Sequence, residues 1–378
     1  MRVLHVISGL GTGGAETMLR RLLSAIPNKE YQSFVVSLTD SGPIGKSIEM
    51  LDVPIFTLEM SSKRVNLNAF RSLRTIVTDT APDLIQGWMY HGNLMALIAS
   101  FFSKGETPVI WNIRHSIGDL GREKFLTRQV IRLGARLSKR PKKIIYNATV
   151  SALQHEALGY ECGGRVIIPN GVDLTRFSPN EGTRAKVRQR LGYESNSIVI
   201  GLLARSHPMK AHKSFIRAAG AISREFHNTQ FLMAGRGIDA ENKELMRSIK
   251  SEKIEDRVRL LGEQSEVPEI LTALDIVTLT SEWGEGFPNI IAEAMACERP
   301  CVVTDVGDSG FLVGNTGLLV PPNDIDAFVR ALRTLISEDR VKRNLRGKNA
   351  RSRISQNFSL GQVAMRYQNL YGEVLANG

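Results

Sequence analysis

Residues 2–16 of the chain read RVLHVISGLGTGGAE. A β-branched apolar run ends in a glycine-rich turn, and an amphipathic helical pattern follows over residues 16–26. The order predicts a β-strand over residues 3–8 that leads through the glycine loop into a helix. Gly9 cuts the apolar run short, so we do not interpret it as the apolar region of a signal peptide.

The same alternation of short β-branched runs and helical patterns continues along the whole chain. In the first half it predicts strands at residues 3–8, 33–38, 55–58, 84–86, 109–113, 144–146 and 166–168. In the second half it predicts strands at residues 198–203, 230–233, 258–260, 276–279, 301–304 and 317–320. Such alternation is typical of right-handed βαβ units. We therefore expect an α/β protein with two Rossmann-like, doubly wound parallel sheets.

A polar, turn-rich stretch at residues 169–180 separates the two series of strands. We place the first domain at residues 1–176 and the second at residues 177–359. Helical patterns at residues 325–355 and 362–375 follow the last strand. We expect the C-terminal helix, in residues 360–378, to pack back on the first domain.

Length and composition are typical of a folded protein of two domains, with no apolar stretch long enough to cross a bilayer. The chain has 378 residues, enough for two domains with cores of their own. Its three cysteines, at positions 162, 297 and 301, are typical of buried free thiols in a reducing compartment, so we expect a cytoplasmic protein. The longest apolar stretch, residues 94–102, is shorter than the roughly 18 residues that cross a bilayer.

The net charge of +11 is concentrated in the first half, because residues 1–176 carry 22 Lys and Arg against 14 Asp and Glu. Within it, residues 122–143 contain nine basic residues and one acid, Glu123. A predicted helix there has an arginine at every fourth position: Arg128, Arg132, Arg136 and Arg140. Its apolar residues fall on a largely separate face: Phe125, Val130, Leu133 and Leu137. We expect this apolar face to pack on the sheet while the arginines face outward.

A basic surface of this kind suits nucleic acid, anionic lipid or a phosphorylated substrate. No RNA- or DNA-binding module accompanies the charge, so a nucleic-acid-binding protein is one alternative and not our expectation. If the protein acts on a lipid-linked molecule, the arginines, with Lys139, Lys142 and Lys143, would draw the domain onto an anionic leaflet. The protein would then be peripheral on the inner face of the membrane.

The glycine loop admits two interpretations. Gly9, Gly11 and Gly14 match the spacing G-x-G-x-x-G, and Asp40 follows the second predicted strand where a ribose-binding acid sits in dinucleotide-binding proteins. This match makes an NAD-dependent oxidoreductase the other alternative. A glycine-rich turn also lets any anionic ligand approach the N-terminus of a helix.

Two loops in the second half carry more specific chemistry. Arg205 and Lys210 follow the strand at 198–203 and can neutralise a diphosphate, or are solvated loop cations. After the strand at 276–279, Glu285 and Glu293 flank the start of a predicted helix. Glu293 can accept hydrogen bonds from two vicinal hydroxyls. The alternatives are that Glu285 caps the helix and that Glu293 lies on a solvated face.

At residues 285–293 the sequence resembles the retaining glycosyltransferases of family 4, because Glu285 and Glu293 match the family's motif of two glutamates separated by seven residues. Residues 13–16, 168–173 and 304–307 and the Arg205/Lys210 pair also resemble family segments. The resemblance spans nearly the whole chain and implies the GT-B architecture, with two Rossmann-like domains facing a central cleft. Ala204 and Ala211 stand where the family often has glycines.

The resemblance implies a role for each matching residue. Arg205 and Lys210 would hold the diphosphate of a nucleotide-sugar donor, and Glu293 its ribose. Glu285 would contact the transferred sugar with help from backbone amides in the segment Phe287, Pro288, Asn289 and Ile290. His115 would reach the donor sugar from the first domain, and Gly13 and Gly14 would lie beside the donor phosphates and the acceptor.

We expect no metal cofactor. Asp324 and Asp326 match the Asp-x-Asp metal signature of another glycosyltransferase architecture, but they stand at a predicted helix start, where carboxylates cap free amides. The resulting hypothesis is a retaining, metal-independent hexosyltransferase that uses a nucleotide-sugar donor and a saccharide or lipid-linked acceptor in polysaccharide or glycolipid assembly.

Overall fold

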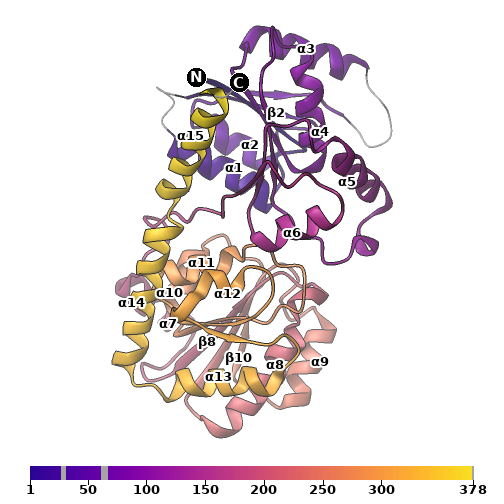
Figure 1. The fold of residues 1–378 in the computed structure, drawn as a ribbon. Helices are drawn as coiled ribbons and strands as arrows, with labels where there is room; N and C mark the ends of the chain where they lie inside the picture. Colours follow the sequence, from indigo (N-terminus) through magenta and orange to yellow (C-terminus); the bar gives the residue numbers. More distant parts are fainter. Residues whose placement is uncertain (27–30, 61–66, 377–378) are drawn as a thin grey trace. The chain divides into compact units, whose positions relative to one another are not determined.

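The structure is a computed structural model that describes residues 1–26, 31–60 and 67–376 (Figure 1). It divides into two compact units, unit 1 with residues 1–171 and 360–378 and unit 2 with residues 172–359. The boundary therefore follows Gly171, whereas the sequence places it after Arg176. Residues 377–378 of the predicted C-terminal segment lie outside the described residues.

Unit 1 is built on a seven-stranded parallel sheet in the order β3-β2-β1-β4-β5-β6-β7. Its strands are β1 Arg2–Ile7, β2 Gln32–Ser37, β3 Ile55–Thr57, β4 Leu84–Trp88, β5 Val109–Ile113, β6 Lys143–Tyr146 and β7 Arg165–Ile167. Its helices are α1 Gly14–Ala25, α2 Gly42–Glu49, α3 Leu67–Thr80, α4 Met89–Ser100, the 3₁₀ turn η1 Leu120–Arg122, α5 Phe125–Leu137, α6 Thr149–Ala157 and α15 Leu360–Ala376.

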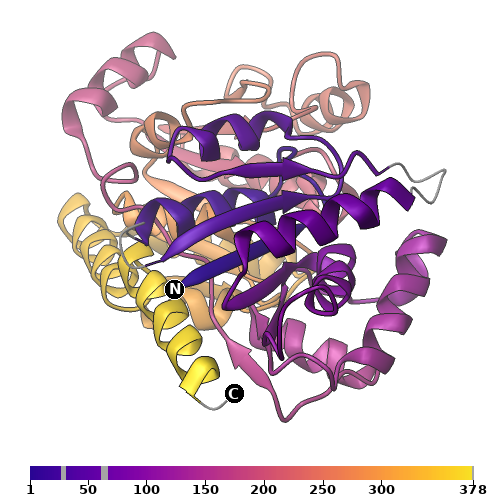
Figure 2. The same cartoon turned by 90° about the horizontal axis from the view of Figure 1, so that it is seen from above.

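Helices cover both faces of this sheet because successive side chains of each strand point to opposite sides. Val3 and Ile7 pack with α1, α2 and α15, while Leu4 and Val6 pack with α3, α4, α5 and α6. The C-terminal helix thus contributes to the core of unit 1, and the N-terminus lies beside it in both views (Figures 1 and 2).

Unit 2 has a six-stranded parallel sheet in the order β10-β9-β8-β11-β12-β13. Its strands are β8 Ile198–Leu203, β9 Thr229–Ala234, β10 Val258–Leu260, β11 Ile276–Leu279, β12 Cys301–Thr304 and β13 Leu318–Val320. Its helices are α7 Glu181–Arg190, η2 Pro208–Lys210, α8 His212–Glu225, α9 Lys243–Glu252, α10 Val267–Ala273, α11 Asn289–Ala296, α12 Ser309–Val313, η3 Gly314–Thr316, α13 Ile325–Ser337 and α14 Arg340–Asn357. All thirteen predicted strands are confirmed, with ends shifted by at most two residues.

Three local expectations are corrected by the structure. The helical pattern at residues 325–355 forms two helices, because the side chain of Asp339 accepts a hydrogen bond from Lys342 N and caps a new helix, α14. Cys297 and Cys301 are buried as expected, but Cys162 is exposed.

The third correction concerns α5. Phe125 and Leu133, predicted to pack on the sheet, are 63% and 45% exposed, whereas Ile131 and Gly134 are buried. A Cβ on Gly134 would lie 2.4 Å from the hydroxyl of Tyr160, so this glycine allows the tyrosine to pack against the helix. The buried stripe is narrower than the apolar pattern of the sequence, and α5 keeps apolar side chains on its surface.

No helix among those described here combines the length and the apolar composition needed to span a bilayer.

Candidate active site

The site in unit 2 lies where the strand order of its sheet reverses. β8 pairs with β9 on one side and with β11 on the other, so the loops after β8 and β11 leave the same edge in opposite directions. Ligands of open α/β sheets bind at such a switch point, beyond the carboxyl ends of the strands. Arg205 and Lys210 belong to the first of these loops and Glu285 to the second.

Lys210 and Glu285 are joined directly. The Lys210 ammonium forms a short ion pair with Oε1 of Glu285, and the hydroxyl of Ser281 donates to the same oxygen at 2.5 Å. The side chains of Lys210 and Glu285 are only 16% and 8% exposed. Both side-chain contacts of Glu285 within the described chain are outside α11, so Glu285 does not cap that helix. The ion pair instead fixes the Lys210 ammonium beside the switch point, at the carboxyl-terminal edge of the sheet.

Backbone contacts fix the loop that carries Glu285. Glu282 N donates to Met209 O at 2.9 Å, and Asp308 N donates to Gly286 O at 2.9 Å. Gly307 has φ +65°, and a Cβ there would lie 2.2 Å from the carbonyl oxygen of Glu285. A glycine is therefore required at this crossing of the loops after β11 and β12. The sequence signal for this contact is the segment at residues 304–307.

The loop after β8 contains two cations, Arg205 and Lys210, and one residue in a strained backbone conformation, Ala211. Arg205 is exposed, and its side chain forms no hydrogen bond or ion pair with any residue that the structure describes. His207 accepts from Met209 N at 3.3 Å and caps the turn η2, and Ala211 follows it in the left-handed region at φ 47°. His212 begins α8, and its Nε2 lies 3.3 Å from Ala204 O. The histidines are thus used to shape the loop.

Helix α11 presents Glu293 and free amides to this edge. Glu293 is in its second turn and is 8% exposed, so the solvated-face interpretation is wrong. The backbone N–H groups of Phe287 and Ile290 donate to no atom within the described residues, while Pro288 occupies the N-cap and Asn289 begins the helix. Amides at the N-terminus of a helix favour an anion or a sugar hydroxyl.

In unit 1, the glycine loop after β1 leaves open space in front of α1. A Cβ on Gly11 or on Gly14 would meet nothing within 4 Å, whereas a Cβ on Gly13 would lie 2.2 Å from an oxygen of the Glu16 carboxylate. Burial raises the pKa of Glu16, and a hydrogen bond to the backbone opposes the rise. No role was predicted for Glu16; the sequence signal for it is an acid in the first turn of the helix.

His115 follows β5 and is held by residues for which no role was predicted. Its Nε2 lies 2.9 Å from Oε1 of Glu123, and its carbonyl oxygen accepts from the hydroxyl of Ser151 at 2.5 Å. Beneath it, Nε2 of His155 lies 2.9 Å from the hydroxyl of Tyr90. Burial lowers the pKa of His155 to about 4, so this histidine is a neutral structural support.

The two aspartates of the Asp-x-Asp sequence, Asp324 and Asp326, lie at the start of α13. Asp324 is the N-cap of α13 and accepts from Ala327 N at 2.8 Å, which confirms the capping interpretation of this residue. Asp326 lies in the first turn of the same helix. In the described part of the chain, no group of three or more His, Cys, Asp or Glu side chains has the arrangement of a metal site.

Comparisons with known proteins agree with this architecture. The model of the family described as Glycosyltransferase Family 4 matches residues 12–176, and that described as Glycosyl transferases group 1 matches residues 197–338. The chain is 33% identical over 220 residues to UDP-Gal:alpha-D-GlcNAc-diphosphoundecaprenol alpha-1,3-galactosyltransferase of Escherichia coli, covering 56% of this chain and 54% of that enzyme. It is 25% identical over 314 residues to the putative glycosyltransferase EpsF of Bacillus subtilis, covering 80% of this chain and 79% of EpsF.

The match to the E. coli enzyme therefore spans about half the length of that relative.

Among solved structures, that of Anabaena Alr3699/HepE in complex with UDP superposes with a TM-score of 0.84 at 24% identity, covering 99% of this chain and 100% of the other. This likeness shows the GT-B fold of two parallel-sheet domains. With one family model matched on each unit and the Glu285/Glu293 spacing on a structured loop and helix, the chain belongs to glycosyltransferase family 4.

Proposed function

We propose that the protein is a retaining, metal-independent glycosyltransferase that moves a hexose from a nucleoside-diphosphate sugar to an acceptor hydroxyl. The observation that carries the proposal is the Lys210–Glu285–Ser281 cluster at the switch point of unit 2. Its cation is already oriented, so little reorganisation is needed when negative charge develops on a leaving diphosphate. The names of relatives, one of which contains UDP-Gal, support a UDP-sugar as the first donor to test.

In this proposal Arg205 and Lys210 bind the diphosphate, and Glu293 accepts hydrogen bonds from the ribose. Glu285 and the free amides of Phe287 and Ile290 bind the hexose. His115 and the glycine loop with Gly13 and Gly14 contribute from the first domain.

The bond between the anomeric carbon and the diphosphate oxygen breaks, and a bond from the acceptor oxygen forms on the same face of the sugar. The acceptor proton passes to the leaving phosphate oxygen, so no protein base is assigned. The cation pair performs the charge neutralisation that a metal supplies in other transferases.

The acceptor class is proposed as a saccharide or a lipid-linked saccharide of polysaccharide or glycolipid assembly. The E. coli relative is named for a diphosphoundecaprenol substrate. For a lipid-linked acceptor we propose peripheral association of unit 1 with an anionic membrane, since Arg132 and Arg136 are exposed on α5.

The test is a thermal-shift panel of UDP-, GDP- and ADP-hexoses with NAD as the competing ligand. A ligand at 100 times its dissociation constant stabilises the folded state by about 2.7 kcal/mol. We expect a shift with one nucleotide sugar, none with NAD, transfer that survives EDTA, and a product whose anomeric configuration by NMR matches the donor's. Loss of activity on chelation, restored by Mg²⁺, would contradict the metal-independent mechanism. A response to NAD alone would favour the oxidoreductase.

A further inference from the structure

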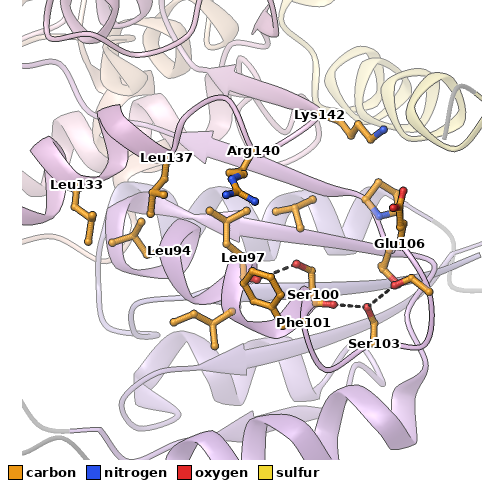
Figure 3. A pocket seen from close by; sticks show the side chains of 15 residues that line it. Leu94, Leu97, Ser100, Phe101, Ser103, Glu106, Leu133, Leu137, Arg140 and Lys142 are labelled. Atoms are coloured by element: carbon orange, nitrogen blue, oxygen red, sulfur yellow. Dashed lines mark hydrogen bonds between the residues drawn. The ribbon is translucent and has the colours of Figure 1, made fainter.

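An open groove of about 630 Å³ lies in unit 1 between α4 and α5, and the proposed function does not use it (Figure 3). Its volume is in the range of small-molecule sites. Apolar side chains from the two helices form its walls: Leu94, Leu97, Ile98, Phe101, Leu133 and Leu137.

Two of the apolar lining side chains are themselves exposed. Phe101 is 76% exposed at the end of α4, and Leu133 is 45% exposed on α5. Phe125 and Leu126, in the first turn of α5, do not line the groove and are each 63% exposed. Exposed apolar side chains around a groove are a feature of binding sites.

One end of the groove is cationic. Arg140 and Lys142 line it there. Figure 3 shows Leu94, Leu133 and Leu137 toward the opposite end and Leu97 beside Arg140. Neither cation forms an ion pair with a described residue. Glu106 is the single acid in the lining, so the cations are in excess. Hydrocarbon walls that end in unpaired cations match an amphiphile with an apolar chain and an anionic head.

The place of the groove in the sheet decides which amphiphile it fits. Its lining includes Val109, the first residue of β5, and Lys142, which precedes β6, so it opens at the amino-terminal edge of the sheet. The glycine loop and His115 lie at the opposite edge, one strand length or roughly 17 Å away. A lipid seated in the groove is therefore part of the surrounding bilayer and not the acceptor that reacts.

We propose that the α4–α5 groove is a membrane-docking site that seats one acyl chain of an anionic phospholipid, with the headgroup phosphate on Arg140 and Lys142. The exposed side chains of Phe101 and Leu133 enter the interfacial layer beside it, and those of Phe125 and Leu126 enter this layer farther along α5. This deepens the proposed membrane association of unit 1 by naming the lipid-binding site and the lipid groups it takes, and it rests on the proposed function only in linking docking to a lipid-bound acceptor.

The test measures binding of the full chain to sedimented vesicles of phosphatidylcholine alone and of an equal mixture of phosphatidylcholine and phosphatidylglycerol. We expect binding to the mixed vesicles only. Arg140→Glu with Lys142→Glu should weaken it by about 30-fold or more, because each basic residue near an anionic surface contributes about fivefold. Arg71→Glu with Arg74→Glu, two exposed arginines on α3, is the matched control and should change binding far less.

Two further variants separate the groove from a flat basic surface. Leu97→Trp fills the groove while keeping it apolar, and we expect it to weaken binding several-fold. Leu133→Ser removes an exposed wall residue that folding does not require, and should act in the same direction. Unchanged binding in both, with binding lost when Arg128, Arg132 and Arg136 become Glu, would overturn the groove and leave simple electrostatic adsorption.

Other outcomes are equally decisive. No binding of the unaltered protein at low salt, or equal binding to both kinds of vesicle, would overturn the proposal. Donor binding in solution is measured for every variant. Lost vesicle binding with intact nucleotide-sugar binding concerns the groove alone, whereas vesicle binding without any nucleotide-sugar binding would contradict the proposed function and leave the docking site standing.

Discussion

The loop after β1 in unit 1 and the loop after β8 in unit 2 hold the same position in their sheets, next to the strand where the order reverses. Their chemistry differs. The first has glycines, open space at Gly11 and Gly14, and the Glu16 carboxylate over the helix start. The second has no glycine, two cations, and a direct tie from Lys210 to Glu285. One topology thus supports two loops of different chemistry. In the proposed function the first allows close approach of a ligand and the second neutralises a diphosphate.

Lys210→Ala should separate the two loops most clearly. It should lower kcat/KM for transfer by about 100-fold or more, since an oriented contact to developing charge is worth roughly 3 to 4 kcal/mol. Lys213→Ala is the matched control, because Lys213 is 64% exposed and pairs with Glu244 at the surface. Turnover and thermal stability are measured for both. Near-normal turnover in Lys210→Ala would remove the unit 2 loop from the reaction.

The two units should also differ in how strongly their stability falls at acidic pH. Burial lowers the pKa of His5 to about 3 and of His155 to about 4, and both lie in unit 1. In the unfolded chain these histidines take up protons as the pH falls below about 6.5, while the folded forms stay neutral. The free energy of unfolding of unit 1 is therefore highest above pH 6.5 and falls toward pH 4. The His155 contribution to this fall is about 3 kcal/mol.

Hydrogen exchange of the full chain across this pH range, resolved by unit, measures the effect. We expect unit 1 to lose protection before unit 2, and His155→Gln to flatten the dependence. Equal loss in both units would show that the buried histidines of unit 1 do not set its acid sensitivity.

On the unit 1 side, Gly14→Ala should raise the KM for substrate about tenfold without lowering the melting temperature. The new methyl group meets no protein atom, so only a ligand is displaced, and Ala suits the first turn of a helix. Gly372→Ala in α15 also enters open space and should leave kinetics unchanged. The same KM in both variants would indicate that no ligand approaches the glycine loop.

The smallest effect concerns the backbone of the unit 2 loop. Ala211 is held at φ 47°, a conformation that costs an L-residue roughly 1 to 2 kcal/mol. Ala211→Gly relieves this strain, partly offset by a more flexible unfolded chain, and should stabilise unit 2 by about 0.5 to 1 kcal/mol in urea unfolding. A loss of stability would mean that the left-handed turn is not the relaxed state of this loop.

Much of the fold was predictable because strands buried between helices leave short β-branched runs in the sequence. All thirteen strands follow from that pattern. The face of α5 did not follow, because an arginine and leucine spacing cannot reveal that Gly134 admits Tyr160 and turns Leu133 to solvent. At the site, spacing and resemblance pointed to Lys210, Glu285 and Glu293, but Ser281, Glu123 and Ser151 had no pattern of their own.

The alternation of elements, the two sheets and the loops that carry the candidate chemistry could be predicted, since these depend on local periodicity and on which residue types occur after each strand. The pairing of Lys210 with Glu285 and of Glu123 with His115 could be recognised in the folded chain alone. The same holds for the apolar groove beside α5 that ends in Arg140 and Lys142. Such contacts depend on how separate elements pack together, and no single segment of the chain records that packing.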